Sequence, residues 1–146
     1  MRVDLKIKSI IEQMQGISYE FNNWATANVT FDNLPLPVCL YILPVSGQIN
    51  LKNDYVRDQP NALIAFLDKA EFDADGEQNE PTVERMKNYA VEFFYRVNQS
   101  GQFKPIPDNL PYSVVYDKLD VNVTGVVFSV QLQEQPGVCI ENFVNC

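Results

Sequence analysis

The run Phe72–Glu80, FDADGEQNE, is the part of the chain whose residue types best suit a metal ion. It holds two aspartates, two glutamates, an asparagine and a glycine. An EF-hand calcium loop has acidic ligands at positions one, three and five, glycine at six and a bidentate glutamate at twelve. With Gly76 at position six, Glu71, Asp73 and Asp75 fall at positions one, three and five. Position twelve, however, is Thr82. Because threonine cannot supply two carboxylate oxygens, we interpret the run as a solvated turn that leads into a helix.

Other catalytic groups are scarce. The chain has no histidine, which excludes Ser-His-Asp and Cys-His catalysis in their ordinary forms and most zinc sites. No phosphate-binding glycine motif occurs. The three cysteines form no C-x-x-C pair, and we expect them to be reduced thiols in a cytoplasm. The sequence therefore predicts a protein that is not an enzyme and that needs no cofactor or metal.

The charge balance argues against several classes of partner. The formal net charge is -8, with 11 basic and 19 acidic residues among 146. Sequence-specific binding of DNA or RNA needs a basic surface, so none is expected. The amino terminus lacks the apolar run of a signal peptide, and no run is long enough to cross a membrane. We expect a cytoplasmic protein that does not bind membranes.

Two segments have the apolar spacing of amphipathic helices. The first runs from Asp4 to Gly16, with an apolar residue at every third or fourth position. The second begins near Pro81 and ends at Ser100–Gly101. Its apolar stripe comprises Val83, Met86, Ala90, Phe93, Phe94 and Val97.

Strands are expected between and after these helices. The polar stretch 46–61 is expected to be a long loop or a protruding hairpin. In the last third, apolar and polar residues alternate from Val126 to Gln133, which predicts one covered and one wetter face. The expected strands are Ala27–Phe31, Val38–Leu43, Ala62–Phe72, Ser113–Val121 and Val123–Gln133.

The order of these elements predicts the fold class. Helix, strands, helix and strands follow one another without a linker or an internal repeat. Residues 1–146 are therefore expected to form a single domain of the α+β class. Its largely antiparallel sheet should carry the two helices packed on one face.

Four residues are candidates for contacts with a partner. Tyr55 and Arg57 lie in the 46–61 stretch, and both residue types are enriched at protein interfaces. Long loops in compact domains are often functional. Asp73 and Asp75 lie in the acidic turn, which can also contact a subunit. Trp24 is expected to be buried or half-buried rather than an interface anchor.

The layout resembles that of small prophage-encoded proteins of the phage tail-completion or head–tail joining type, which are tail terminator-like. The resemblance rests on the amino-terminal helix MRVDLKIKSIIEQMQG, the strand PVCLYILPVSG and the segment FLDKAEFD. It continues through the helix PTVERMKNYAVEFFYRVNQSGQF and the segment VVYDKLDVNVTGVVFSVQLQEQPGVCIENF. The resemblance therefore spans nearly the whole chain, in the order of the elements and in their pattern of residue types.

The resemblance implies a role in virion assembly. Proteins of this kind form or join a ring at the end of the tail, stop growth of the tail tube and join the tail to the capsid. The partners implied are other tail or connector proteins and further copies of the chain in a homo-oligomeric ring. The locations implied are the bacterial host cytoplasm and then the virion. The 46–61 stretch and the strand edges would make the contacts.

Two other functions are compatible with the sequence. A stand-alone module that binds a small molecule or peptide would use a pocket lined by Trp24, Tyr41 or Tyr116. A hydrolase with two carboxylates would use the acidic residues, with a divalent metal at Asp73, Asp75 and Glu77 in one version.

Overall fold

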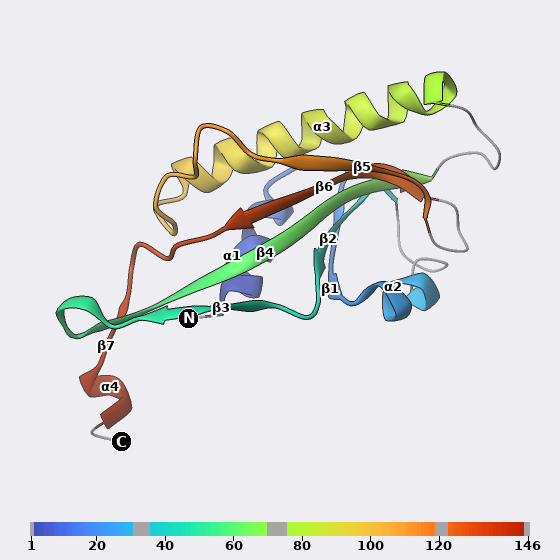
Figure 1. Ribbon diagram of the computed structural model, residues 1–146. Coiled ribbons are helices and arrows are strands. Elements are labelled where there is room, and N and C mark those ends of the chain that lie inside the picture. Colours follow the sequence, from blue (N-terminus) through green and yellow to red (C-terminus); the bar gives the residue numbers. More distant parts are fainter. Residues whose placement is uncertain (1, 31–35, 70–75, 119–122, 145–146) are drawn as a thin grey trace.

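The computed structural model describes residues 2–30, 36–69, 76–118 and 123–144, and within them it contains helices and one seven-stranded sheet (Figure 1). The described helices are α1 (Val3–Glu12), α2 (Trp24–Thr30), α3 (Gly76–Gln99) and α4 (Glu141–Val144), with a 3-10 turn at Lys52–Asp54. The strands are β1 (Ser18–Asn22), β2 (Val38–Ile42), β3 (Ser46–Asn50), β4 (Tyr55–Lys69), β5 (Tyr112–Lys118), β6 (Val123–Gln131) and β7 (Val138–Cys139).

The sheet has the order β1-β2-β4-β6-β5, and β3 and β7 pair with the first half of β4. The β1–β2 pair is parallel, and every other pair is antiparallel. This arrangement confirms the predicted α+β class with a largely antiparallel sheet. None of the described helices is long and apolar enough to cross a membrane.

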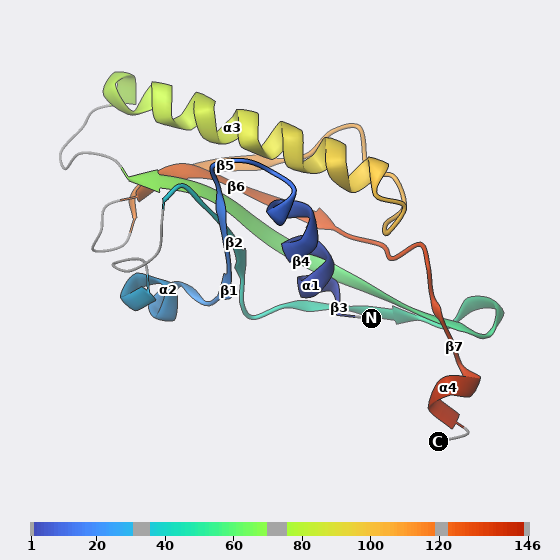
Figure 2. The ribbon, with the colours of Figure 1, turned by 180° about the vertical axis from the view of Figure 1, so that it is seen from behind.

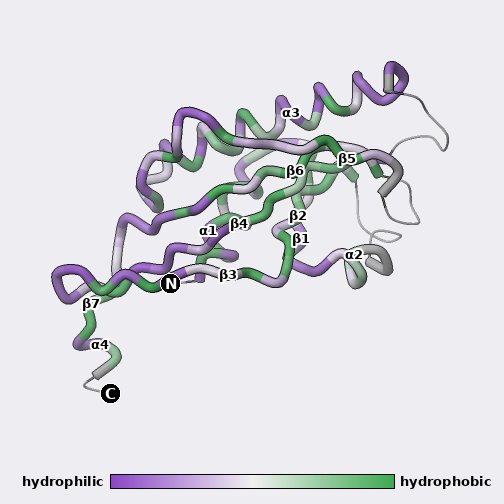
Figure 3. Tube along the Cα trace, in the orientation of Figure 1, coloured by the Kyte–Doolittle hydropathy of each residue, from purple (hydrophilic) through white to green (hydrophobic). Residues whose placement is uncertain are grey.

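Both predicted amphipathic helices form and cover the same face of the sheet. Figure 2 shows α1 and α3 on this face. In Figure 3 hydrophilic and hydrophobic residues alternate along α3, as in an amphipathic helix. Their buried side chains meet Phe66, Val126 and Phe128 of the sheet in one core cluster. The helix α3 begins at Gly76, more than one turn before the predicted Pro81. Glu77 and Glu80 favour this earlier start because acidic side chains stabilise the positive end of a helix.

The opposite face carries a smaller core under α2. Ala27 and the half-buried Trp24 pack there against alternate residues of β2, β4 and β6, which include Leu40 and Leu67. Trp24 is therefore half-buried, as expected. The larger part of this face, beyond α2, is wetter, with Leu63 41% exposed and Ser129 also exposed.

The prediction of a strand at Ala27–Phe31 is wrong, because the described part of this range, 27–30, is helical. Asn23 starts this helix, since its side-chain oxygen accepts a hydrogen bond of 2.7 Å from the backbone N–H of Thr26. An asparagine in this position satisfies an N–H that the first turn leaves unpaired. The strand of this region lies earlier, at Ser18–Asn22. The β-branched residues after Asn23 therefore misled a prediction based on propensity.

The long strand β4 connects two parts of the molecule. Its second half, from Asn61 to Lys69, lies between β2 and β6 in the body of the sheet. Its first half pairs with β3 in a hairpin that reaches away from the body (Figure 1). The stretch 46–61 is therefore a protruding hairpin, one of the two predicted forms, and the strand predicted to begin at Ala62 already begins at Tyr55.

Close packing between β4 and β6 requires a glycine at position 125. A Cβ atom on Gly125 would lie 1.9 Å from the carbonyl oxygen of Phe66 on the neighbouring strand. Gly125 pairs with Leu67 on one side and with Val115 on the other, so it lies in the middle of the sheet. The two backbones could not keep their spacing around a larger residue.

We therefore predict that Gly125→Val lowers the free energy of unfolding by roughly 3 kcal/mol, because the side chain would push β6 away from β4. Urea denaturation followed by circular dichroism would measure the change. Gly101→Ala is the control, since no atom lies within 4 Å of its Cβ position and only its positive φ is strained. That control should lose about 1 kcal/mol, and equal losses in the two variants would contradict the prediction.

Candidate assembly surface

The hairpin and the C-terminal segment together form an arm, which we define as residues 44–59 and 135–144. The C-terminal segment crosses the hairpin near its tip, where β7 pairs with Tyr55 and Val56 just after the turn that joins β3 to β4. The backbone N–H of Ile140 donates to the carbonyl oxygen of Asp54 at 2.8 Å. The short helix α4 then ends the described chain beyond the hairpin (Figure 1).

Arg57 and Gly137 hold the C-terminal segment against the hairpin. The Arg57 guanidinium donates to the carbonyl oxygens of Gln135 at 3.2 Å and of Lys52 at 3.3 Å, and it lies over the Tyr55 ring. A Cβ atom on Gly137 would lie 2.9 Å from the Cβ atom of Tyr55. A glycine is needed there because the two segments approach so closely.

The arm has no hydrophobic core of its own. None of its described residues belongs to either of the two core clusters of the body. It exposes large apolar side chains instead, each between 36% and 58% accessible: Val45, Ile49, Leu51, Tyr55 and Phe143. An isolated two-stranded hairpin is only marginally stable in water. A second protein that covered these side chains would stabilise the arm.

The hairpin is also electrically neutral within a strongly acidic chain. Between residues 44 and 61 the two bases Lys52 and Arg57 balance the two acids Asp54 and Asp58. The segment 68–80 contrasts with it, since it holds six acidic residues and one lysine. Charge repulsion between two hairpins would therefore be weaker than between two 68–80 segments.

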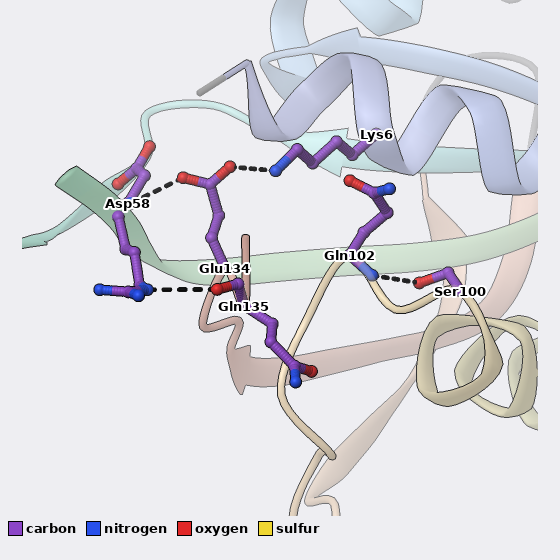
Figure 4. A network of polar contacts seen from close by, with 7 residues as sticks. Lys6, Asp58, Ser100, Gln102, Glu134 and Gln135 are labelled. Atoms are coloured by element: carbon purple, nitrogen blue, oxygen red, sulfur yellow. Dashed lines mark hydrogen bonds and ion pairs between the residues drawn. The ribbon is translucent and has the colours of Figure 1, made fainter. Parts of the chain in front are cut away.

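A buried carboxylate, that of Glu134, joins the arm to the body. Glu134 is 1% exposed, forms an ion pair with Lys6 of α1 and accepts a hydrogen bond of 2.7 Å from the backbone N–H of Asp58 (Figure 4). Its own backbone N–H donates to the carbonyl oxygen of Asp58 at 3.2 Å. One side chain thus connects α1, β4 and the segment that leads to β7.

Asp58 lies beside this carboxylate, and its own side chain accepts a hydrogen bond from the Gln59 backbone N–H. No ion pair to Asp58 is found within the described part of the chain. Burial, and next the negative charge of Glu134, raise the pKa of the Asp58 carboxyl above its usual range. The ionised form of Asp58 is therefore disfavoured in the folded protein.

The structure places two of the four predicted contact residues on the arm. Tyr55 is 45% exposed and Arg57 is half-buried at the junction with the C-terminal segment. Asp73 and Asp75 lie outside the described residues, so the predicted acidic contact and the alternative metal site cannot be placed. Over the described ranges no group of three or more acidic, histidine or cysteine residues is placed to hold a metal ion.

The three aromatic residues named for the alternative binding module lie in different parts of the fold, and one of them, Tyr41, lines a cavity. Trp24 packs in the smaller core under α2, whereas Tyr41 lies in the larger core under α1 and α3, on the opposite face. Tyr116 is 45% exposed on the edge strand β5. These three aromatic residues therefore do not line one cavity.

Sequence reasoning missed Glu134 and Asp58. Both are acidic residues in polar stretches, where acidic residues are usually solvated. Their roles depend on contacts with residues up to 128 positions away, such as that of Glu134 with Lys6. The exposed Ile49 and Leu51 carried a usable signal, because they are isolated apolar residues in an otherwise polar hairpin.

Comparison with known proteins adds no family assignment. No protein-family model matches the chain, and no curated protein matches it significantly.

We predict that Glu134→Leu lowers the free energy of unfolding by roughly 3 kcal/mol, because it leaves Lys6 without its anion and the Asp58 N–H without an acceptor. Glu134→Gln keeps an acceptor for that N–H and should lose about half as much. Urea denaturation at pH 7 would measure both. Glu92→Gln removes the exposed Glu92–Arg96 pair and should cost about 0.5 kcal/mol or less. Losses as small as this control in both Glu134 variants would contradict the prediction.

We also predict that Asp58→Asn stabilises the protein at pH 7. A carboxyl whose pKa is raised by folding contributes stability below its unfolded pKa of about 3.9 and loses it as the pH rises through the folded value. At pH 7 the ionised Asp58 faces Glu134 without this contribution, so a neutral amide should raise the free energy of unfolding. At pH 3 the two proteins should be equally stable.

Urea denaturation of the wild-type protein and of Asp58→Asn between pH 3 and pH 7 would measure the sign of the change in the free energy of unfolding. Asp108→Asn changes the net charge equally at an exposed position and is the control. A stabilisation by Asp58→Asn that was the same at pH 3 and pH 7, or that the control also gave, would show that the carboxyl has no raised pKa.

Proposed function

We propose that the chain is a non-enzymatic structural protein of a bacteriophage particle, which acts in tail completion or head–tail joining through protein–protein contacts. It would be made in the cytoplasm of the bacterial host and become part of the virion. Its partners would be further copies of itself and the tail or connector proteins next to it. The resemblance in sequence layout suggests the setting, and the arm is the observation that carries the proposal.

The arm supports an assembly role for a physical reason. An arm that projects from the body, lacks a core and exposes five large apolar side chains becomes more stable when another chain covers it. Its neutral charge removes the repulsion that two chains of net charge -8 would otherwise meet. In the described chain β3 has β4 as its one neighbour, so its other edge can also accept a strand.

An assembly protein also fits the absence of any catalytic constellation in the described residues. One buried group of titratable residues there, Lys6, Asp58 and Glu134, joins the arm to the body. Net acidity would let DNA pass a ring of such subunits without binding to it.

Light scattering on a sizing column across a concentration series tests the proposal. The monomer mass is 16.7 kDa, and we predict a larger species whose share grows with concentration. Ile49→Asp on β3 should return the protein to a monomer, because it places a charge on the apolar surface of the arm. Val91→Asp is the matched control on α3, where Val91 is 69% exposed, and it should leave the mass unchanged.

Two outcomes would count against the proposal. One is a wild-type protein that stays monomeric at all concentrations and binds no tail or connector protein of a phage that encodes it. The other is an oligomer that Ile49→Asp and Val91→Asp weaken equally, which would remove the arm from the contact.

A further inference from the structure

A cavity of about 200 Å³ lies where α1 begins, between the body and the arm. Its walls are mainly apolar and come from Val3, Phe21, Val45 and Pro60. Its polar side chains are Tyr41, Asp58 and the ion pair between Arg2 and Asp4. The assembly role proposed above does not use this cavity, and the following inference does not depend on that role.

The hydroxyl group of Tyr41 is a buried polar group without a partner in the described protein. Tyr41 is 2% exposed, and its ring packs on Phe21 with 4.9 Å between the ring centroids. Within the described residues its hydroxyl forms no hydrogen bond, whereas that of the neighbouring Tyr19 donates to the carbonyl oxygen of Asp4 at 3.1 Å. Buried polar groups are nearly always hydrogen-bonded, so an unpaired hydroxyl beside a cavity indicates a missing partner.

Asp58 adds a negative charge to the same cavity and forms no ion pair with the described residues. Arg2 is bound to Asp4 at 2.6 Å and Lys6 is bound to Glu134. Lys6 and the amino-terminal charge favour the ionised form of Asp58, but burial and Glu134 outweigh them, since the pKa of Asp58 is raised. Burial raises the pKa of Tyr41 to about 12, and the charges of Asp58 and Asp4 add to this effect. The cavity therefore offers a carboxylate and a phenol oxygen close together, and both can accept hydrogen bonds from a cation.

A second hollow, of about 420 Å³, adjoins this cavity and follows β3. The two share Val45, Asp58 and Pro60 as lining residues. Gly47 also lines the second hollow, and a Cβ atom on it would lie 2.7 Å from the carbonyl oxygen of Gln59, so a glycine is needed where β3 and β4 approach. Asp58 therefore borders both the cavity and the hollow along β3.

We propose that this cavity binds the side chain of a lysine from a partner protein, carried on an extended segment that lies along the free edge of β3. The ammonium group would donate to the Asp58 carboxylate and to the Tyr41 hydroxyl. The aliphatic stem of the lysine would lie against Val45 and Pro60, as such stems commonly do on apolar surface. Pairing of the segment with β3 supplies affinity, and the cavity supplies specificity.

The chemistry of the cavity favours lysine over other ligands. An anion would face Asp58 and Asp4, whose carboxylates would repel it. A guanidinium group binds best to a carboxylate that presents both oxygens in one plane, whereas an ammonium group is a compact charge with three rotatable donors. Two separate acceptors at the end of an apolar channel therefore suit a lysine side chain.

The test is an NMR titration of the isotope-labelled protein with two acetylated five-residue peptides. Both have β-branched residues on either side of the centre, where one carries lysine and the other norleucine, which has an uncharged stem of similar length. We expect saturable shifts at the amides of Val45, Gly47 and Asp58. The lysine peptide should bind roughly tenfold more tightly, which is the usual effect of a hydrogen bond to a charged group.

Variants assign this preference to the cavity. Asp58→Asn should make the two peptides bind equally, and Tyr41→Phe should reduce the preference about threefold, because it removes one neutral acceptor. Neither change is expected to unfold the protein, since one removes a disfavoured charge and the other an unpaired hydroxyl. Asp108→Asn, which removes an exposed charge elsewhere, should keep the full preference.

Three results would overturn the proposal. The first is the absence of saturable binding by either peptide. The second is equal binding of the two peptides by the wild-type protein. The third is a lysine preference that survives Asp58→Asn, because the charge that selects lysine would then lie elsewhere.

Discussion

The carboxylate of Glu134 is the interaction on which the arrangement of body and arm depends. Removing an ionised carboxylate from water costs several kcal/mol unless a counter-charge and hydrogen-bond donors replace the solvent. Lys6 supplies the charge from α1, and the backbone of Asp58 supplies a donor from β4. Both are available only when the first helix, the first half of the longest strand and the start of the C-terminal segment are all in place. A single buried side chain therefore fixes the direction in which the arm leaves the body.

The strand β4 belongs to both the body and the arm. Its second half is buried between β2 and β6, while its first half holds β3 and β7 outside the body. Because one continuous strand spans both halves, a partner on the arm would contact a strand that is anchored in the core. This anchoring restricts the positions of the hairpin before any partner binds. Preorganisation of this kind lowers the entropic cost of association.

The features of the fold and the site that the sequence could predict are those that depend on residues close together in the chain. The helices α1 and α3 and the alternation in β6 follow from local spacing, and the sequence predicted them with the correct class of fold. The helix α2 was missed because one capping side chain, that of Asn23, outweighed the strand propensity of the residues after it. The hairpin was one of two predicted forms, and Tyr55 and Arg57 do lie on it. Glu134 and Asp58 could not be recognised, since their surroundings are assembled from residues far apart in the chain.

The distribution of charge sets the arm apart from the rest of the chain. The segment 68–80 is strongly acidic, so molecules of this protein repel one another wherever such segments approach. The hairpin has no net charge, but within it the carboxylate of Asp58 lies beside Glu134 and forms no ion pair with the described residues. A neutral apolar surface can accept many partners, whereas a half-buried carboxylate without an ion pair favours one that brings a positive charge. If a partner binds the arm as proposed above, this carboxylate would make the contact selective.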